Sequence, residues 1–118
     1  MSELIQYSLI NSRDSSNVFI SAGMDKVVAT MPDDTMQGEI EIGSLVAINI
    51  ERSHLMNDGI YAFYWDGIFM IKRLQFIGDA ILVIPASKFY MSWEIEPAIE
   101  DKLQIIGRVV ASQEIKVH

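Results

Sequence analysis

The sequence predicts a mostly β domain built from short strands, and three observations indicate this fold class. Half of the 118 residues are apolar and 21% are charged, a balance typical of a chain with a packed core. The apolar runs are short, and turn residues such as the Asp66-Gly67 pair separate them. Few segments show helical patterning. A chain of this length is expected to form one domain, residues 1–118.

The N-terminal half begins with a weak helical signal. Residues 14–17 offer N-cap side chains, and residues 18–22 followed by Gly23 are typical of a short helical turn with a glycine stop. Valine-rich and alternating segments then predict strands. In order, the expected elements are a strand at residues 26–31, a loop at 32–43 and a strand at 44–50.

The C-terminal half carries a strong hairpin signal. Residues 59–65 and 68–75 flank Asp66-Gly67, and this dipeptide favours the tight turn of a two-residue hairpin. A second turn is expected at residues 77–80. The remaining strands are expected at residues 81–85 and 103–111. Many short strands with close turns indicate a barrel-like or sandwich-like body.

Charge and cysteine content exclude several functions. The net charge is −7, and the nine basic residues are scattered along the chain, whereas phosphate binding requires clustered Lys and Arg. Any DNA-related function therefore needs a separate DNA-binding domain. Cysteine is absent, so disulfides and thiolate metal sites are excluded.

Targeting and metal signals are lacking as well. No apolar run approaches the roughly 20 residues of a membrane span, and the N-terminus has no basic region before a long apolar run. We expect a cytoplasmic protein with no membrane contact. His54 and His118 lie far apart in the sequence and lack ligand spacing, so we expect neither a metal nor a cofactor.

Lys72 is the first candidate for chemistry. Strand alternation places it on the same face as Met70 and Leu74, which is an apolar setting. Desolvation there would lower the pKa of the amine, and a neutral amine can take a proton from a neighbouring hydroxyl. The alternative is an edge-strand lysine whose stem runs out to water.

Thr35 is the second candidate, within the run Asp33-Asp34-Thr35. Taken alone, this run is typical of a helix N-cap or a turn in which a side chain binds a nearby backbone N–H. The functional interpretation is a hydroxyl nucleophile on a tight loop. Local pattern alone favours the turn.

Four motifs in order resemble the LexA and phage-repressor peptidase family. Residues 34–46 are similar to the family's active-site segment, Gly-Asp-Ser-Met-x-Pro followed by Gly-Asp-x-Val. Asp58-Gly59-Ile60-Tyr61 is similar to its Asp-Gly-x-Tyr, Ile71-Lys72-Arg73-Leu74 to its Val-Lys-Arg-Leu, and Ile105-Ile106-Gly107-Arg108-Val109-Val110 to its closing strand. The resemblance covers about residues 26–111.

The resemblance implies a LexA/signal-peptidase-like β-ribbon barrel with at most one or two short helices. It implies a Ser-Lys type dyad with Thr35 and Lys72 in the two positions, and the backbone N–H of Met36 as an oxyanion donor. It also implies a homodimer paired through C-terminal strands, with residues 105–111 as the first candidate. Family members are regulators of the SOS response, phages and mobile elements that bind DNA through a helix-turn-helix domain, for which this chain has no candidate.

Departures from the family pattern bear on activity. Thr35 stands in the place of the nucleophilic serine, Asp33 in that of a glycine, and Gly38 in that of a proline; Ser44 also replaces a common aspartate. The extra methyl of threonine stiffens its χ1 torsion. A carboxylate beside the oxyanion site has the wrong charge, and pairing with Lys72 would raise the pKa of the amine. We therefore expect a lost or weakened peptidase.

Other readings stay open. Members of the resembled family that cleave themselves cut an Ala-Gly or Cys-Gly bond well before the serine. This chain has one Ala-Gly bond, Ala22-Gly23, which lies so close to Thr35 that we interpret Gly23 as a helix stop. One alternative function is an active threonine–lysine hydrolase acting in cis or in trans. Another is a ligand- or partner-binding module with a cleft near Trp65 and Tyr90, although aromatic residues on strands are typically core.

Overall fold

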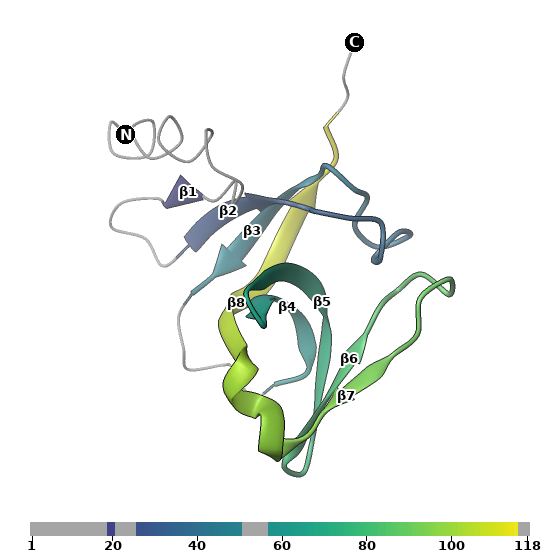
Figure 1. The fold of residues 1–118 in the computed structure, drawn as a ribbon. Coiled ribbons are helices and arrows are strands. Elements are labelled where there is room, and N and C mark those ends of the chain that lie inside the picture. Colours follow the sequence, from purple (N-terminus) through teal and green to yellow (C-terminus); the bar gives the residue numbers. More distant parts are fainter. Residues whose placement is uncertain (1–18, 21–25, 51–56, 116–118) are drawn as a thin grey trace.

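One antiparallel sheet contains all the strands of the described residues (Figure 1). The computed structural model describes residues 19–20, 26–50 and 57–115, and its strand order is β1-β2-β3-β8-β4-β5-β6-β7. The elements are β1 (Phe19–Ile20), β2 (Lys26–Thr30), β3 (Leu45–Asn49), β4 (Gly59–Trp65), β5 (Ile68–Ile77), β6 (Ala80–Ile84), β7 (Trp93–Ile95), the 3₁₀ helix η2 (Pro97–Lys102) and β8 (Leu103–Gln113). The predicted mostly β fold is confirmed.

Strand β8 joins the two halves of the sheet. Its first part, Leu103 to Arg108, pairs with β4, and its second part, Arg108 to Gln113, pairs with β3. Register shifts interrupt both ladders, between Ala47 and Ile48 and between Ala62 and Phe63. Such bulges bend a strand and increase its twist. In Figure 1 the short strands β1 to β3 lie at one end of β8, and the ribbon of β4 to β7 curls at the other.

A glycine allows β8 to pass close to β3. A Cβ atom on Gly107 would collide with the backbone carbonyl of Asn49, so only glycine fits there. The next residue, Arg108, lies against Gly59 and donates a hydrogen bond of 2.9 Å to the Asp58 carbonyl oxygen. The motif that begins at Asp58 and the motif that contains Arg108 are therefore in direct contact.

The core divides into two clusters of buried side chains. The first lies under β2, β3 and the loop between them, and the second lies inside the ribbon of β4 to β7. The first contains Val27, Ala29, Met31, Met36, Ile40, Val46, Ile48, Ala62 and Ile71. The second contains Tyr61, Phe63, Leu74, Ile81, Val83 and Ile95. Because strand β5 contributes to both, its central residues lie where the two clusters meet.

The β4–β5 hairpin has the predicted turn. Asp66 and Gly67 have φ angles of 51° and 83°, which is the left-handed pair that a type I′ turn requires. The turn fixes the register in which Tyr61 lies opposite Lys72. The hairpin prediction is confirmed, and the turn determines which way Lys72 points.

The aromatic side chains on the strands pack against one another, as expected for core residues. Trp65 contacts Trp93 with ring centroids 5.1 Å apart, and Tyr61 meets Phe76 edge-on at 5.8 Å. Within the described ranges, no helix is long and apolar enough to span a membrane.

The predicted helical turn at residues 18–22 is wrong where the structure describes it. Phe19 and Ile20 form strand β1, which pairs with Val28 and Val27 of β2. Aromatic and β-branched side chains favour a pleated surface, and the neighbouring strand supplies hydrogen-bond partners that a single helical turn lacks. The rest of that segment, including the Ala22-Gly23 bond, lies outside the described residues.

Candidate active site

Backbone hydrogen bonds close the base of the loop between β2 and β3, and a buried side chain holds the loop against the core. Met31 N donates to the Ser44 carbonyl at 2.9 Å, and Gly43 N donates to the Met31 carbonyl at 3.0 Å. The Met36 side chain is fully buried in the first core cluster. These contacts hold the adjacent residue, Thr35, with its side chain turned inward and 7% of its surface exposed.

Lys72 reaches the same place from the middle of β5. It is 7% exposed, although it is a lysine. Burial lowers the pKa of its amine because a low-dielectric setting disfavours the ammonium, and the Asp33 carboxylate opposes this by favouring the charged form. Burial is the larger effect, so the pKa of Lys72 lies below its ordinary value.

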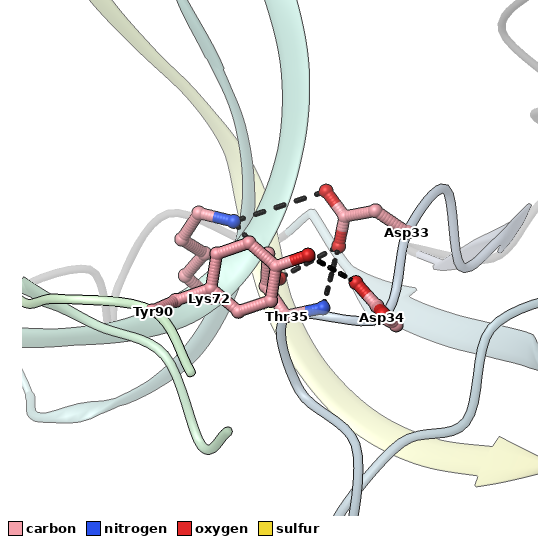
Figure 2. Close-up of polar contacts among 5 residues, drawn as sticks. All are labelled: Asp33, Asp34, Thr35, Lys72 and Tyr90. Atoms are coloured by element: carbon pink, nitrogen blue, oxygen red, sulfur yellow. Dashed lines mark hydrogen bonds and ion pairs between the residues drawn. The ribbon is translucent and has the colours of Figure 1, made fainter. Parts of the chain in front are cut away.

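Thr35, Lys72 and Asp33 meet in one cluster (Figure 2). The Lys72 Nζ lies 2.9 Å from the Thr35 Oγ1, and it lies 3.9 Å from the Asp33 Oδ2. Asp33 also accepts two hydrogen bonds at its Oδ1, from the Thr35 hydroxyl at 2.6 Å and from the Thr35 backbone N–H at 3.1 Å. The two residues singled out from the sequence thus lie within hydrogen-bond distance.

The positions of the protons follow from this geometry. A hydroxyl carries one hydrogen, and the Thr35 hydroxyl directs it to the Asp33 carboxylate, so the Thr35 Oγ1 accepts from Lys72. General-base activation requires the reverse, with a neutral amine accepting the hydroxyl proton. The carboxylate therefore competes with Lys72 for the proton that a nucleophile must lose. It also binds the Thr35 N–H, a donor of the type that an oxyanion would need.

A second acid–hydroxyl pair lies beside the first and was not anticipated. Tyr90, from the segment between β6 and β7, donates its phenol hydrogen to the Asp34 Oδ1 at 2.5 Å. This bond and the nearby negative charge raise the pKa of the Tyr90 phenol. From the sequence, Tyr90 was expected either in the aromatic core or at a cleft with Trp65, whereas its phenol contacts the loop between β2 and β3. No sequence signal connects residues 34 and 90, which lie far apart in the chain.

The catalytic roles expected from the sequence are separate from the positions of the residues. Met36 lies beside the cluster, and its role as an oxyanion donor stays a prediction. The same holds for the catalytic roles of Thr35 and Lys72. In the part of the chain that the structure describes, no three His, Cys, Asp or Glu side chains gather to hold a metal ion. His54 and His118 lie outside the described residues.

The fold and this cluster define a known class of protein. The chain belongs to the Peptidase S24-like family, whose model matches residues 6–110. It is also similar to the 26 kDa repressor protein of Escherichia phage HK022, with 32% identity over 88 residues. That match covers 75% of this chain and 37% of the relative, so the chain spans little more than a third of that protein. The LexA and phage-repressor resemblance is confirmed.

Proposed function

We propose that this chain is a self-associating regulatory domain of a repressor of phage or mobile-element type, with a restrained, degenerate self-cleavage dyad at Thr35 and Lys72. The observation that carries the second part is the hydrogen bond from the Thr35 hydroxyl to the Asp33 carboxylate at 2.6 Å. Membership of the Peptidase S24-like family and the similarity to a phage repressor support the regulatory role.

Two features of the cluster support a restrained dyad. The threonine methyl limits rotation about χ1 and crowds the approach of a carbonyl carbon to the hydroxyl. The Asp33 carboxylate holds both the hydroxyl and the backbone N–H of Thr35, so a substrate would have to displace it from each. The Asp33 carboxylate also favours the protonated form of the Lys72 amine, and a protonated amine cannot accept the hydroxyl proton.

The open edge of β8 supports self-association. Beyond Arg108, the described strands give β8 a partner on one side only, which is β3. Val110 lies on this part of β8, with 49% of its surface exposed. Unpaired strand edges are ready templates for pairing with another chain, and an antiparallel pair of identical edges gives a two-fold dimer. Within the predicted segment 105–111, Ile105 and Gly107 pair with β4, and Val109 and Ala111 pair with β3.

An apolar hollow of about 250 Å³ lies on β2, β3 and β8 beside this edge. Its lining residues are Val28, Leu45, Ala47, Ala111, Ser112 and Gln113. A second copy pairing along β8 would bring apolar side chains toward it and remove this surface from water. The unpaired strand edge and the apolar hollow lie on the same face, and this combination favours it as the site of self-association.

Sedimentation velocity across a concentration series tests the self-association. The wild-type chain is expected to sediment as a dimer, and Val110→Asp is expected to shift it to monomer because two like charges would face each other near the axis. Ile77→Asp is the matched control, as Ile77 is 54% exposed but lies at the far end of β5. A monomeric wild type, or equal loss in both variants, would refute the dimer.

In this proposal, DNA contact depends on a separate domain. The acidic balance of the chain, with nine basic and sixteen acidic residues, disfavours direct binding to phosphates. Regulation of transcription places the protein in the cytoplasm. A filter-binding assay with the chain alone is expected to show no retention of duplex DNA at physiological salt.

An active threonine–lysine peptidase is the second candidate, and two observations favour it. The Lys72 amine lies 2.9 Å from the Thr35 hydroxyl, and its pKa lies below the ordinary value. Both are requirements of a working dyad. Cleavage of an added Ala-Gly peptide by the wild-type chain at alkaline pH, abolished by Lys72→Ala, would establish this candidate over the restrained dyad.

A further inference from the structure

The segment between β6 and β7 contains a turn at residues 87–91, which we call the tip. Phe89 and Met91 are 86% and 87% exposed, while Tyr90 between them is 45% exposed and turns back toward the protein. Ser87 organises this turn. Its carbonyl accepts from Tyr90 N at 3.2 Å, and its Oγ accepts from Phe89 N at 3.3 Å. The direction of the Tyr90 side chain is therefore built into the local backbone.

The tip holds the Thr35 loop at two adjacent points. Ser87 N donates to the Thr35 carbonyl oxygen at 2.9 Å. The Tyr90 phenol donates to the Asp34 carboxylate at 2.5 Å, and Figure 2 shows the ring reaching across to it. One bond fixes the backbone at residue 35, and the other fixes the side chain just before it.

The two neighbouring aspartates serve different partners. Asp33 faces Lys72 at 3.9 Å and the Thr35 hydroxyl at 2.6 Å, whereas Asp34 faces Tyr90. Asp33 acts on the pKa of Lys72, whereas the pKa of Tyr90 is raised mainly by Asp34 and to a smaller extent by Asp33. A carboxylate on the same loop without a partner would be drawn toward the buried ammonium.

We propose that Tyr90 is a positioning residue that holds the Asp34 carboxylate away from Lys72, so that only one of the two adjacent acids reaches the amine. This inference rests on the proposed function only in treating Thr35 and Lys72 as the dyad whose proton balance matters. Asp33 is the acid that pairs with Lys72, and Asp34 is the acid that Tyr90 binds instead. The phenol thereby limits how far the loop can hold Lys72 in its charged form.

The test is the pKa of the Lys72 amine, followed by NMR of a side-chain carbon in the intact chain through an alkaline titration. In Tyr90→Phe the ring remains and the hydrogen bond is lost, so Asp34 becomes free to turn and the pKa of Lys72 is expected to rise. In Tyr90→Phe combined with Asp34→Asn that rise is expected to disappear. Tyr64→Phe, on β4 against Phe69, is the matched control and is expected to leave the pKa unchanged.

Two results would overturn the inference. One is an unchanged Lys72 pKa in Tyr90→Phe. The other is a rise that persists after Asp34→Asn, because the second acid would then not be its source. The readout needs neither peptide cleavage nor dimer formation, so it stands or fails separately from the proposed function.

Discussion

The amine of Lys72 lies 2.9 Å from the hydroxyl oxygen of Thr35, yet the hydroxyl hydrogen is directed to Asp33 at 2.6 Å. The two side chains of the proposed dyad thus lie within hydrogen-bond distance, while the hydroxyl hydrogen of Thr35 points to the Asp33 carboxylate. A glycine before the nucleophile, as in the resembled family pattern, has no side chain to do this. The Asp33 carboxylate binds the Thr35 Oγ1, and the threonine methyl restricts the position of that same oxygen.

Removing the carboxylate at position 33 is expected to lower the pKa of Lys72 further. Burial lowers this pKa, and Asp33 partly opposes that effect because its carboxylate favours the ammonium. In Asp33→Asn only the effect of burial remains. Side-chain NMR titration of Lys72 measures the change. Asp66→Asn, in the β4–β5 turn, serves as the control. A pKa that rises in Asp33→Asn would contradict the assignment of charges.

Thr35→Ser is expected to increase the rate of cleavage of an added Ala-Gly peptide. Serine keeps the hydroxyl and removes the methyl that restricts χ1. Since a misplacement near 1 Å costs about 10²-fold, a gain of roughly 10- to 100-fold is expected in a discontinuous peptide assay at alkaline pH. Thr30→Ser on β2, outside the cluster, should have no effect. A Thr35→Ser variant no faster than the wild type would show that the methyl is not limiting.

Lys72→Met is expected to preserve or increase stability at neutral pH. The lysine is 7% exposed, and burial disfavours its ammonium, whereas a methionine of similar size carries no charge to desolvate and Asp33 is partly exposed to water. Urea unfolding followed by tryptophan fluorescence measures the difference. Lys72→Ala is the contrasting variant, because it leaves a cavity and is expected to destabilise. A large loss of stability in Lys72→Met would indicate that the amine contributes a structural bond.

The Lys72→Met advantage should shrink as the pH rises. The pKa of Lys72 is lowered in the folded chain from 10.5, so between the folded and unfolded values the unfolded state binds the extra proton. The stability of the wild type then increases with pH in this window. Taking the difference between the two proteins removes the titration of Tyr61 and Tyr90, whose pKa values are raised. A difference that widens with pH would contradict the lowered pKa.

Two glycines are expected to differ sharply when each is changed to alanine. At Gly67 nothing lies within 4 Å of an added Cβ, and the φ of 83° costs about 1–2 kcal/mol. At Gly107 the Cβ would collide with the Asn49 carbonyl, so roughly 3 kcal/mol or more is expected. Urea unfolding of both variants compares them. Equal losses would mean that β8 is not held close to β3.

The sequence predicted the elements that local chemistry determines. Asp66-Gly67 predicted the hairpin because few residues adopt two successive positive φ angles. Alternation along β5 predicted an inward Lys72, which the structure confirms by its 7% exposure. The family motifs singled out Thr35, whose local sequence alone is typical of a turn.

Contacts between segments far apart in the chain could not be predicted from the sequence. The helical turn at residues 18–22 was wrong at Phe19 and Ile20, since pairing with β2 overrides an N-cap pattern. The sequence offered the aromatic core or a cleft with Trp65 as the place of Tyr90, but no pattern indicated that its phenol binds Asp34. From the sequence, either of the adjacent residues Asp33 and Asp34 could pair with Lys72. Which of them faces the amine depends on a tip 56 residues away from Asp34 in the chain.

The most direct test of the restrained dyad is the rate of Ala-Gly peptide cleavage by the double variant Asp33→Gly/Thr35→Ser, with and without Lys72→Ala. We predict that the double variant cleaves well above the wild-type rate and that adding Lys72→Ala abolishes the gain. A wild-type chain that cleaves as fast as the double variant, or a gain that survives Lys72→Ala, would contradict it.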